Sequence, residues 1–193
     1  MINPSQITDF NRGPYELQEF LLFCISVAGK NAVTQAQKLE EFLAGRSSLN
    51  VTPFAHVRTL DAEGRLRSEM ERVKLGKYGL LVPGFRAAAL LDDRLTQVDR
   101  KELAELPGVG LKTASFFLLH SRPAQRLAVL DTYVLKFIGR THPKMVLPPT
   151  SPQRLHRYLE LESVFLGECL KSGQLDPAQA DLNCWNSRGH SLS

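Results

Sequence analysis

Cysteine is scarce in this 193-residue chain, and long apolar runs are missing. The three cysteines, Cys24, Cys169 and Cys184, are odd in number and far apart, so they indicate neither a disulfide framework nor a zinc or iron–sulfur ligand set. No apolar run approaches the length of a membrane span, and residues 1–10 lack the basic and apolar parts of a signal peptide. We therefore expect an intracellular protein without membrane contact, in the cytoplasm or nucleoid, or in the nucleus if the source is eukaryotic.

Charge is only slightly unbalanced. The formal net charge is +4 and the pI is about 9.1, which permits a polyanionic partner without requiring one. The five histidines show no metal-ligand spacing, and His120, His142 and His156 are expected to be structural or exposed. We therefore expect no metal site built from side chains.

Alternation of apolar and polar residues, which marks a half-buried strand, is missing as well. Apolar residues instead recur at helical spacing, and Asp131 and Asp176 stand where helix N-caps are expected. The sequence predicts an all-α fold without repeats, in which Pro83-Gly84 interrupts the chain before a helix. The expected helices are two segments between residues 14 and 43, separated near 26–31, then segments at about 53–58, 62–73, 85–91, 100–105, 111–120, 131–139, 154–166 and 177–188.

A glycine-rich hairpin separates two of these helices. Leu106-Pro107-Gly108-Val109-Gly110 places a proline where the first helix ends, and the two glycines let the backbone turn tightly. The amides of Gly108 and Gly110 then become donors at a helix N-terminus, an arrangement suited to a DNA phosphate. Taken alone, the same pattern also fits an ordinary tight corner between two helices.

A lysine and an aspartate follow this hairpin. Lys112 lies at the start of the next helix, within Leu111-Lys112-Thr113-Ala114, and Asp131 caps the helix after that, within Leu130-Asp131-Thr132-Tyr133-Val134. Taken singly, a solvated lysine and a capping aspartate are ordinary features. Their combination with the hairpin points instead to a lysine nucleophile with a carboxylate partner.

These segments, in this order, resemble the signature of the helix-hairpin-helix (HhH-GPD) DNA glycosylase superfamily. The resemblance implies one two-lobed all-α unit over residues 1–193, with an active-site cleft between the lobes. Lobe A spans about 15–125 and ends in the helix-hairpin-helix at 99–120, and lobe B spans about 126–193 together with 1–14. The four closely spaced cysteines of the cluster-bearing branch are missing, so no iron–sulfur cluster is expected.

The resemblance also implies the chemistry. In this family the lysine marks bifunctional members, so Lys112 is expected to form a Schiff base with the sugar and to cleave the strand by β-elimination. Asp131 is expected to stabilise positive charge on the deoxyribose and to orient or deprotonate Lys112. The residues expected to bind DNA phosphate are Gly108, Val109, Gly110 and Thr113.

The C-terminal segment points to the base. Asp181 and Trp185 are four residues apart and share one helix face, so a stacking ring and an acceptor for a guanine edge lie together. This segment resembles the compact archaeal-type 8-oxoguanine glycosylases, the second Ogg family. In that family a terminal lysine carboxylate also reads the base; here the chain ends in Ser193, which the resemblance places in the same base-recognition role, although the missing lysine also fits a different base. Phe85, in a Gly-aromatic-Arg helix start similar to the family's, completes the expected base-recognition set.

The N-terminal segment resembles the part of these enzymes that approaches the gap left by the flipped base. Asn31 and Lys30 are the residues expected to fill this gap or to contact the opposite base. The expected partner is damaged double-stranded DNA, bound by a monomer without a cofactor, although the resemblance allows a monovalent cation on the hairpin carbonyls. Two alternatives stay open: a glycosylase for another modified base, such as a modified pyrimidine or adenine, and a non-catalytic helix-hairpin-helix module that binds duplex DNA.

Overall fold

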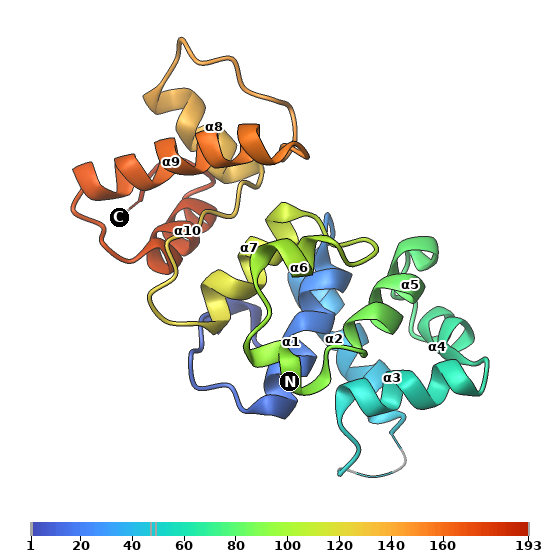
Figure 1. Ribbon diagram of the computed structural model, residues 1–193. Helices are drawn as coiled ribbons and strands as arrows, with labels where there is room; N and C mark the ends of the chain where they lie inside the picture. Colours follow the sequence, from blue (N-terminus) through green and yellow to red (C-terminus); the bar gives the residue numbers. More distant parts are fainter. Residues whose placement is uncertain (1, 47, 49, 193) are drawn as a thin grey trace. The chain divides into compact units, whose positions relative to one another are not determined.

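The computed structural model describes residues 2–46, 48 and 50–192. Within these ranges the chain forms helices and no strand, so the all-α prediction is confirmed (Figure 1). The chain folds as two compact units, Met1–Val109 and Gly110–Ser193, called unit 1 and unit 2 below. No helix in the described part of the chain is long and apolar enough to cross a membrane.

The boundary between the units differs from the expected one at about 125/126. It falls within the hairpin, so the helix that follows the hairpin belongs to unit 2. This helix is tied to unit 2 by a long-range contact that local sequence patterns do not predict. His120, in this helix, is hydrogen-bonded to Asp181 near the C-terminus. As a result, Lys112 and Asp131 lie in the same unit, whereas the sequence had suggested one from each lobe.

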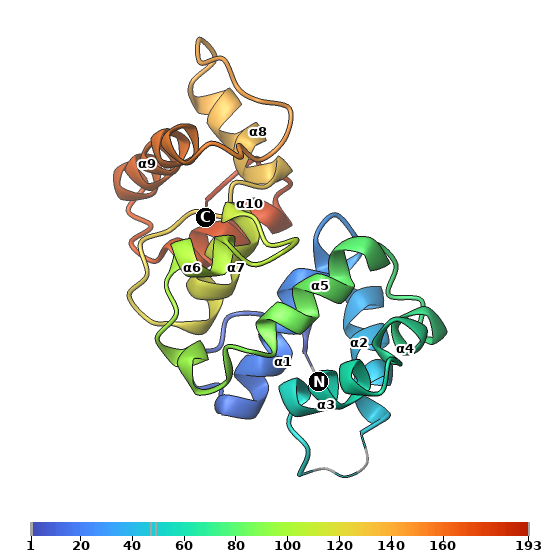
Figure 2. The same cartoon turned by 45° about the vertical axis from the view of Figure 1, so that its right-hand side comes forward.

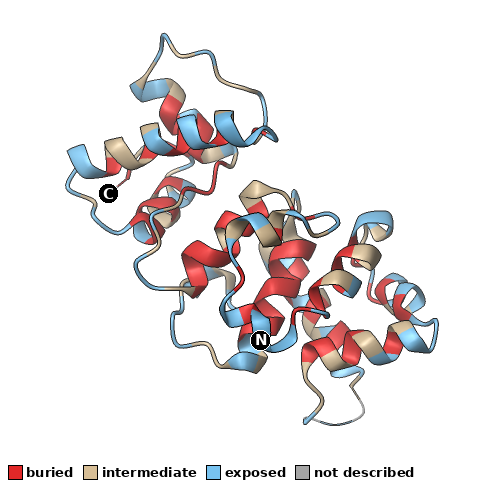
Figure 3. Ribbon diagram, in the orientation of Figure 1, coloured by how far each residue is buried: buried red, intermediate tan, exposed pale blue. Residues whose placement is uncertain are grey.

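Unit 1 is organised around a helix that is buried on all sides. In α1 (Pro14–Val27), every residue from Leu17 to Ser26 is buried, as its colour in Figure 3 makes clear. Helix α1 contacts α2, α3 and α5, while α4 packs on α3 and α5 (Figure 2). The further elements of unit 1 are η1 (Pro4–Gln6), α2 (Ala32–Ala44), α3 (Pro53–Ala62), α4 (Leu66–Arg72), α5 (Tyr78–Ala88), η2 (Asp92–Thr96) and α6 (Arg100–Ala104).

Helix α5 begins earlier than predicted and runs through Pro83-Gly84, where the sequence had suggested an interruption. Pro83 has no N–H group, so it cannot donate the helical hydrogen bond to the carbonyl of Gly79. Gly79 is itself exposed. Gly84 compensates because it permits a close helix-to-loop contact: a Cβ atom there would lie 2.7 Å from the carbonyl oxygen of Pro107. Packing against the hairpin therefore keeps α5 continuous.

Unit 2 consists of α7 (Leu111–Ser121), α8 (Thr132–Thr141), α9 (Leu155–Lys171) and α10 (Pro177–Asn186). Helix α10 contacts the other three helices. Its N-terminus was predicted correctly, because Asp176 accepts a hydrogen bond from the amide of Ala178 and Pro177 is the first helical residue. Both α9 and α7 extend beyond their predicted ends, α9 by a full turn to Lys171.

The segment before α8 is held by two buried polar side chains of α9. The hydroxyl of Tyr158 donates to the carbonyl of Ala128 at 2.7 Å, and Glu162 accepts from the amide of Ala128 at 2.9 Å. Both side chains are buried, Tyr158 completely. Because these bonds fix the chain just before Asp131, the position of that carboxylate is set by the core of unit 2 rather than by a loose loop.

Candidate active site

The hairpin contains a tight turn with the geometry that its sequence demands. The amide of Val109 donates to the carbonyl of Leu106 at 3.0 Å, and Gly108 has a φ of +75°. Proline at the second position and glycine with positive φ at the third are the residues of a type II turn. The turn is tied to α5, because a Cβ on Gly108 would lie 3.1 Å from the carbonyl oxygen of Leu80.

The turn leads into a helix N-terminus that has no side-chain cap. Gly110 is the N-cap of α7 and offers no side-chain acceptor to the first amides of the helix. Gly108 is exposed, whereas the side chains of Val109 and Thr113 are buried. Contact of Thr113 with a phosphate would therefore involve its backbone amide and not its hydroxyl, whereas the amide of Val109 already donates to the carbonyl of Leu106.

The carbonyls of the turn were expected to suit a monovalent cation. That of Leu106 accepts a hydrogen bond from Val109, and that of Pro107 faces Gly84 at close range. Among the described residues, nothing donates to the carbonyls of Gly108 and Val109, so these two oxygens of the hairpin have no hydrogen-bond donor within the chain. Within the same residues there is no group of three or more side chains that could hold a metal ion.

Lys112 is the second residue of α7 and is partly buried. Among the described residues, its ammonium group takes part in no hydrogen bond or ion pair. An amine without a structural partner near a helix N-terminus is available for reaction.

Asp131 caps α8 as predicted. One oxygen, Oδ1, accepts from the amides of Tyr133 at 2.8 Å and of Val134 at 2.9 Å. In the described part of the chain, Oδ2 accepts no hydrogen bond, so this second oxygen stays available. Asp131 thus combines a structural role through Oδ1 with a free carboxylate oxygen on the same side chain.

The pKa of Asp131 is raised from 3.8 to about 6. Burial is the main cause, because the charged form loses water, and the negative charge of Asp181 adds to it. The amides of Val134 and Tyr133 and the positive charge of Lys112 act in the opposite direction. Three of the predicted site residues, Lys112, Asp131 and Asp181, are therefore close enough to influence one another.

Asp181 and Trp185 occupy the same helix, α10, with very different exposure. Asp181 is 7% exposed, and its Oδ2 lies 3.1 Å from Nε2 of His120. Trp185 is 52% exposed and meets Tyr133 edge-on, with ring centroids 6.2 Å apart. Lys136 lies 5.5 Å from the Tyr133 ring centroid. An accessible indole beside a recessed carboxylate is the arrangement needed to stack a flat ring and accept hydrogen bonds from its edge.

The C-terminal tail lies against α10 up to the last described residue. Leu192 is buried, and its carbonyl accepts from the side-chain amide of Asn183 at 2.8 Å. Gly189 permits a close approach to α8, because a Cβ there would lie 2.5 Å from the carbonyl oxygen of Tyr133. Ser193, expected to take part in base recognition, lies outside the described residues.

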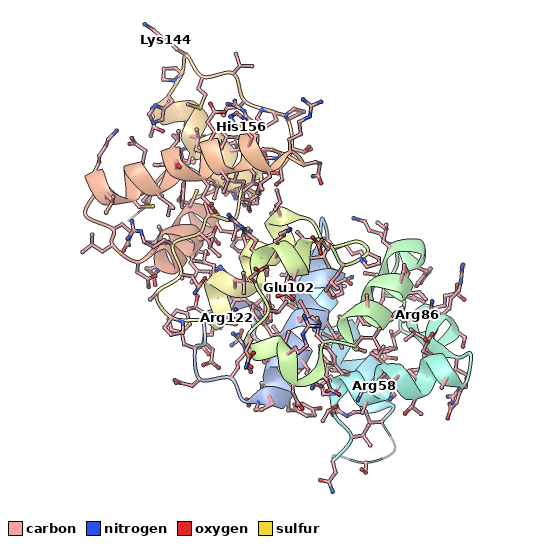
Figure 4. All side chains as sticks on the ribbon, in the orientation of Figure 1. Arg58, Arg86, Glu102, Arg122, Lys144 and His156 are labelled. Atoms are coloured by element: carbon pink, nitrogen blue, oxygen red, sulfur yellow. The ribbon has the colours of Figure 1, made fainter. Side chains whose placement is uncertain are left out.

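The remaining predicted site residues lie in unit 1 and have structural roles there. Phe85 is fully buried and packs edge-on against Phe42, with centroids 5.9 Å apart, so its ring offers no face to a base. Lys30 donates to the carbonyls of Leu75 and Gly76. Asn31 is exposed and caps α2 by accepting from the amide of Thr34. Arg86, next to Phe85 and labelled in Figure 4, forms an ion pair with Asp61 at 2.6 Å.

Two residues of this region were missed as functional candidates, His120 and Tyr133. His120 was considered isolated because its partner is 61 residues away, a separation that no helical spacing reveals. Tyr133 follows Asp131 in the quoted signature, but only the fold brings it against Trp185. Neither position could have been assigned without the contacts of α10.

Comparison with known proteins adds no relative. No family model matches the sequence, and neither the search of curated proteins nor that of solved structures gives a match.

Proposed function

We propose that this protein is a bifunctional DNA glycosylase and abasic-site lyase of the helix-hairpin-helix type that excises 8-oxoguanine from duplex DNA. One observation carries the proposal. Within unit 2, an uncommitted Lys112 lies within electrostatic range of the partly buried carboxylate of Asp131, directly after a Pro-Gly turn and an uncapped helix N-terminus. A purely structural lysine and aspartate would need none of these neighbours.

In the first step, the neutral amine of Lys112 forms a bond to C1′ of the damaged nucleotide. The bond between C1′ and the base breaks, and its electron pair leaves with the base, which takes up a proton from water. Positive charge develops on the sugar during this step, and a nearby carboxylate stabilises it. Asp131, with a pKa of about 6, is mainly ionised at pH 7 and can supply that negative charge.

In the second step, the same covalent bond leads to strand cleavage. The amine loses a proton to water and the bond between C1′ and the ring oxygen opens; its electron pair leaves with the oxygen, which takes up a proton to become a hydroxyl, and a protonated imine forms on Lys112. This cation acidifies the hydrogen on C2′, which Asp131 or water removes, and the 3′ phosphate leaves with the electron pair of its bond to C3′. Water then hydrolyses the imine and regenerates Lys112.

Asp181 and Trp185 support guanine as the base. A carboxylate oxygen accepts hydrogen bonds and donates none, so it suits the adjacent N1 and N2 hydrogens of a guanine edge. The exposed face of Trp185 can stack on the extruded ring. Specificity for the oxidised form of guanine is the part of the proposal that rests on the sequence resemblance alone.

Covalent trapping tests the proposal. Borohydride should reduce the imine and give a stable complex with a duplex that contains 8-oxoguanine, and Lys112→Gln should abolish it. Lys144→Gln is the matched control, because Lys144 is an exposed lysine of unit 2 on the loop between α8 and α9 (Figure 4). Trapping that persists undiminished in Lys112→Gln would contradict the proposed nucleophile.

The hairpin by itself favours a second candidate, a non-catalytic module that binds duplex DNA through phosphate contacts. Its exposed turn and free amides suit a phosphate whether or not chemistry follows. Such a module would bind undamaged duplex in a salt-sensitive way and would nick no substrate. A panel of end-labelled duplexes with different lesions, scored separately for base excision and for nicking, distinguishes this function and identifies the base.

A further inference from the structure

A completely buried histidine holds the carboxylate that faces the proposed base site. His120, in the last turn of α7, has 0% exposure, and its Nε2 lies 3.1 Å from Oδ2 of Asp181 on α10. Histidine is rarely buried so completely without a polar partner. The two residues are 61 positions apart, so this bond also joins two helices of unit 2.

The geometry assigns each atom of this pair a direction. A carboxylate oxygen is a hydrogen-bond acceptor, so the 3.1 Å contact assigns the donor role to Nε2 of His120. The imidazole ring is fixed by Phe116, which meets it edge-on with centroids 5.0 Å apart. Among the described residues, the side chain of Asp181 has no other hydrogen bond, so Oδ1 is the oxygen left for a ligand.

Asp181 is buried in a region that also contains a second aspartate and two thiols. Asp131 and Cys184 are within electrostatic range of Asp181, and burial together with these two aspartates raises the pKa of the Cys184 thiol to about 12. Cys169, on α9, is a further neighbour, and its thiol pKa is raised to about 11, mainly by burial. Arg140 and Arg126 act in the opposite direction on the pKa of the Cys184 and Cys169 thiols, while His120 makes the hydrogen bond to the side chain of Asp181 itself.

We propose that His120 is a positioning residue: its Nε2–H fixes Oδ2 of Asp181 and thereby presents Oδ1 as an oriented acceptor for the edge of the substrate base. His120 acts through Asp181 and does not touch the base. This inference rests on the proposed glycosylase function, because it requires that Asp181 contact a base during excision.

Glutamine and asparagine at position 120 make a matched pair for the test. The amide nitrogen of glutamine superposes on Nε2 of histidine and retains a donor to Asp181, whereas that of asparagine superposes on Nδ1 and falls short. Both variants place an uncharged amide in the same buried pocket. A requirement for the donor therefore separates the two, while a requirement for an imidazole that fills space affects them alike.

The experiment measures two reactions on each variant with the full chain. Excision of 8-oxoguanine requires base recognition, whereas nicking of a duplex with a preformed abasic site requires Lys112 but no base. We expect His120→Asn to lose about tenfold or more in excision, as for loss of a hydrogen bond to a charged group, and to keep abasic-site nicking within about twofold. His120→Gln should keep both reactions near those of the unaltered protein. In the background of Asp181→Asn, His120→Asn should cause no additional loss of excision.

The outcomes distinguish the positioning role of His120 from the proposed glycosylase function on which it rests. Equal excision by His120→Asn and His120→Gln, or an equal fall of excision and abasic-site nicking in His120→Asn, would overturn the positioning role. Additive losses in the double variant would also overturn it. If the unaltered protein neither excises the base nor nicks the abasic site, the proposed function itself fails, whatever the variants do.

Discussion

Asp181 and Asp131 influence each other across the contact between α10 and α8, and the charge of Asp181 helps to raise the pKa of Asp131 to about 6. Lys112 and two backbone amides oppose this effect. The carboxylate proposed to act with Lys112 therefore changes charge close to neutral pH instead of far below it. Perturbed pKa values of this kind are more frequent at functional sites than elsewhere.

The rate of base excision should accordingly decrease in acid. Protonation of Asp131 removes the negative charge that stabilises the sugar cation, so the rate at saturating duplex should fall about tenfold per pH unit below pH ~6. Single-turnover excision between pH 4.5 and 8 measures this. In Asp131→Asn the rate should be about 100- to 1,000-fold lower at pH 7 and should lack the inflection near pH 6. An unchanged acid limb in that variant would assign the titration to another group.

Asp131 should also make the fold less stable as pH rises. Its folded-state pKa lies above the unfolded value of 3.8, so between pH 3.8 and about 6 the folded state binds more protons than the unfolded one. The contribution of Asp131 to the free energy of unfolding therefore falls through this window. Asparagine retains an oxygen for the helix cap without the charge, so Asp131→Asn should gain stability relative to the unaltered protein, by up to about 3 kcal/mol above pH 6.

Urea unfolding of both proteins at pH 4 and at pH 7 checks this expectation. The variant should gain most of its relative stability between the two pH values. If the two proteins differ in free energy of unfolding by the same amount at pH 4 and at pH 7, burial does not destabilise the charged form of Asp131.

Gly84 should be intolerant of a side chain because α5 approaches the hairpin there. A Cβ at this position would lie 2.7 Å from the carbonyl oxygen of Pro107 and 3.3 Å from a methyl group of Ile25. We expect Gly84→Ala to lower the free energy of unfolding by about 1–3 kcal/mol. Gly79→Ala is the control in the same helix: nothing lies within 4 Å of its Cβ, and alanine there should be neutral or stabilising by up to about 1 kcal/mol. Equal effects of the two substitutions in denaturant would contradict the tight contact.

The same glycine illustrates what the sequence could predict. Helical periodicity located most elements, and the N-caps Asp131 and Asp176 were read correctly, because caps and periodicity are local properties. The Pro83-Gly84 pair was misinterpreted as a break, since its compatibility with α5 depends on a loop more than twenty residues later. Local patterns could not foresee a tertiary contact that overrides them.

The residues of the candidate site also fall into those that local sequence patterns could predict and those that depend on tertiary contacts. Lys112 and Asp131 could be proposed because the hairpin, the lysine and the capping aspartate stand in a recognisable order. Phe85 was predicted to recognise the substrate base because of the Gly-aromatic-Arg pattern, yet its ring is buried in the core of unit 1 and does not reach solvent. His120 was overlooked because its role depends on a hydrogen bond to Asp181. Residues whose roles depend on long-range packing were those that the sequence misjudged.

Trp185 should matter more for lesion binding than for stability. The residue is 52% exposed, so Trp185→Ala removes about half of the surface that a fully buried tryptophan would contribute, including the contact with Tyr133. Loss of one base-stacking ring typically costs about 1–3 kcal/mol, which predicts weaker binding of the lesion-bearing duplex by about 5- to 150-fold. Binding to the catalytically inactive Lys112→Gln form and thermal unfolding, each with and without Trp185→Ala, measure the two effects. Equal weakening for undamaged duplex would assign Trp185 to the phosphate backbone instead of the base.

Lys30 provides a test of whether a residue expected at the strand gap is instead a structural tie. Its ammonium donates to the carbonyls of Leu75 and Gly76, and burial, with Lys77 and Lys38 nearby, lowers its pKa. Lys30→Met retains the length of the side chain without the donor, and it should lower the free energy of unfolding by about 1–3 kcal/mol because two carbonyls lose a charged partner.

Lys101→Met, at an exposed lysine of α6, is the control for Lys30→Met and should change stability by less than about 0.5 kcal/mol. Urea unfolding gives the stability of each variant, and binding of a duplex with an abasic gap gives its affinity. If Lys30→Met unfolds like the unaltered protein but binds the gapped duplex more weakly than Lys101→Met does, Lys30 contacts DNA. Its hydrogen bonds to the two carbonyls would then contribute little to stability. If stability falls and affinity follows the control, the lysine belongs to the scaffold of unit 1, and Asn31, exposed at the start of α2, is the remaining candidate for the gap.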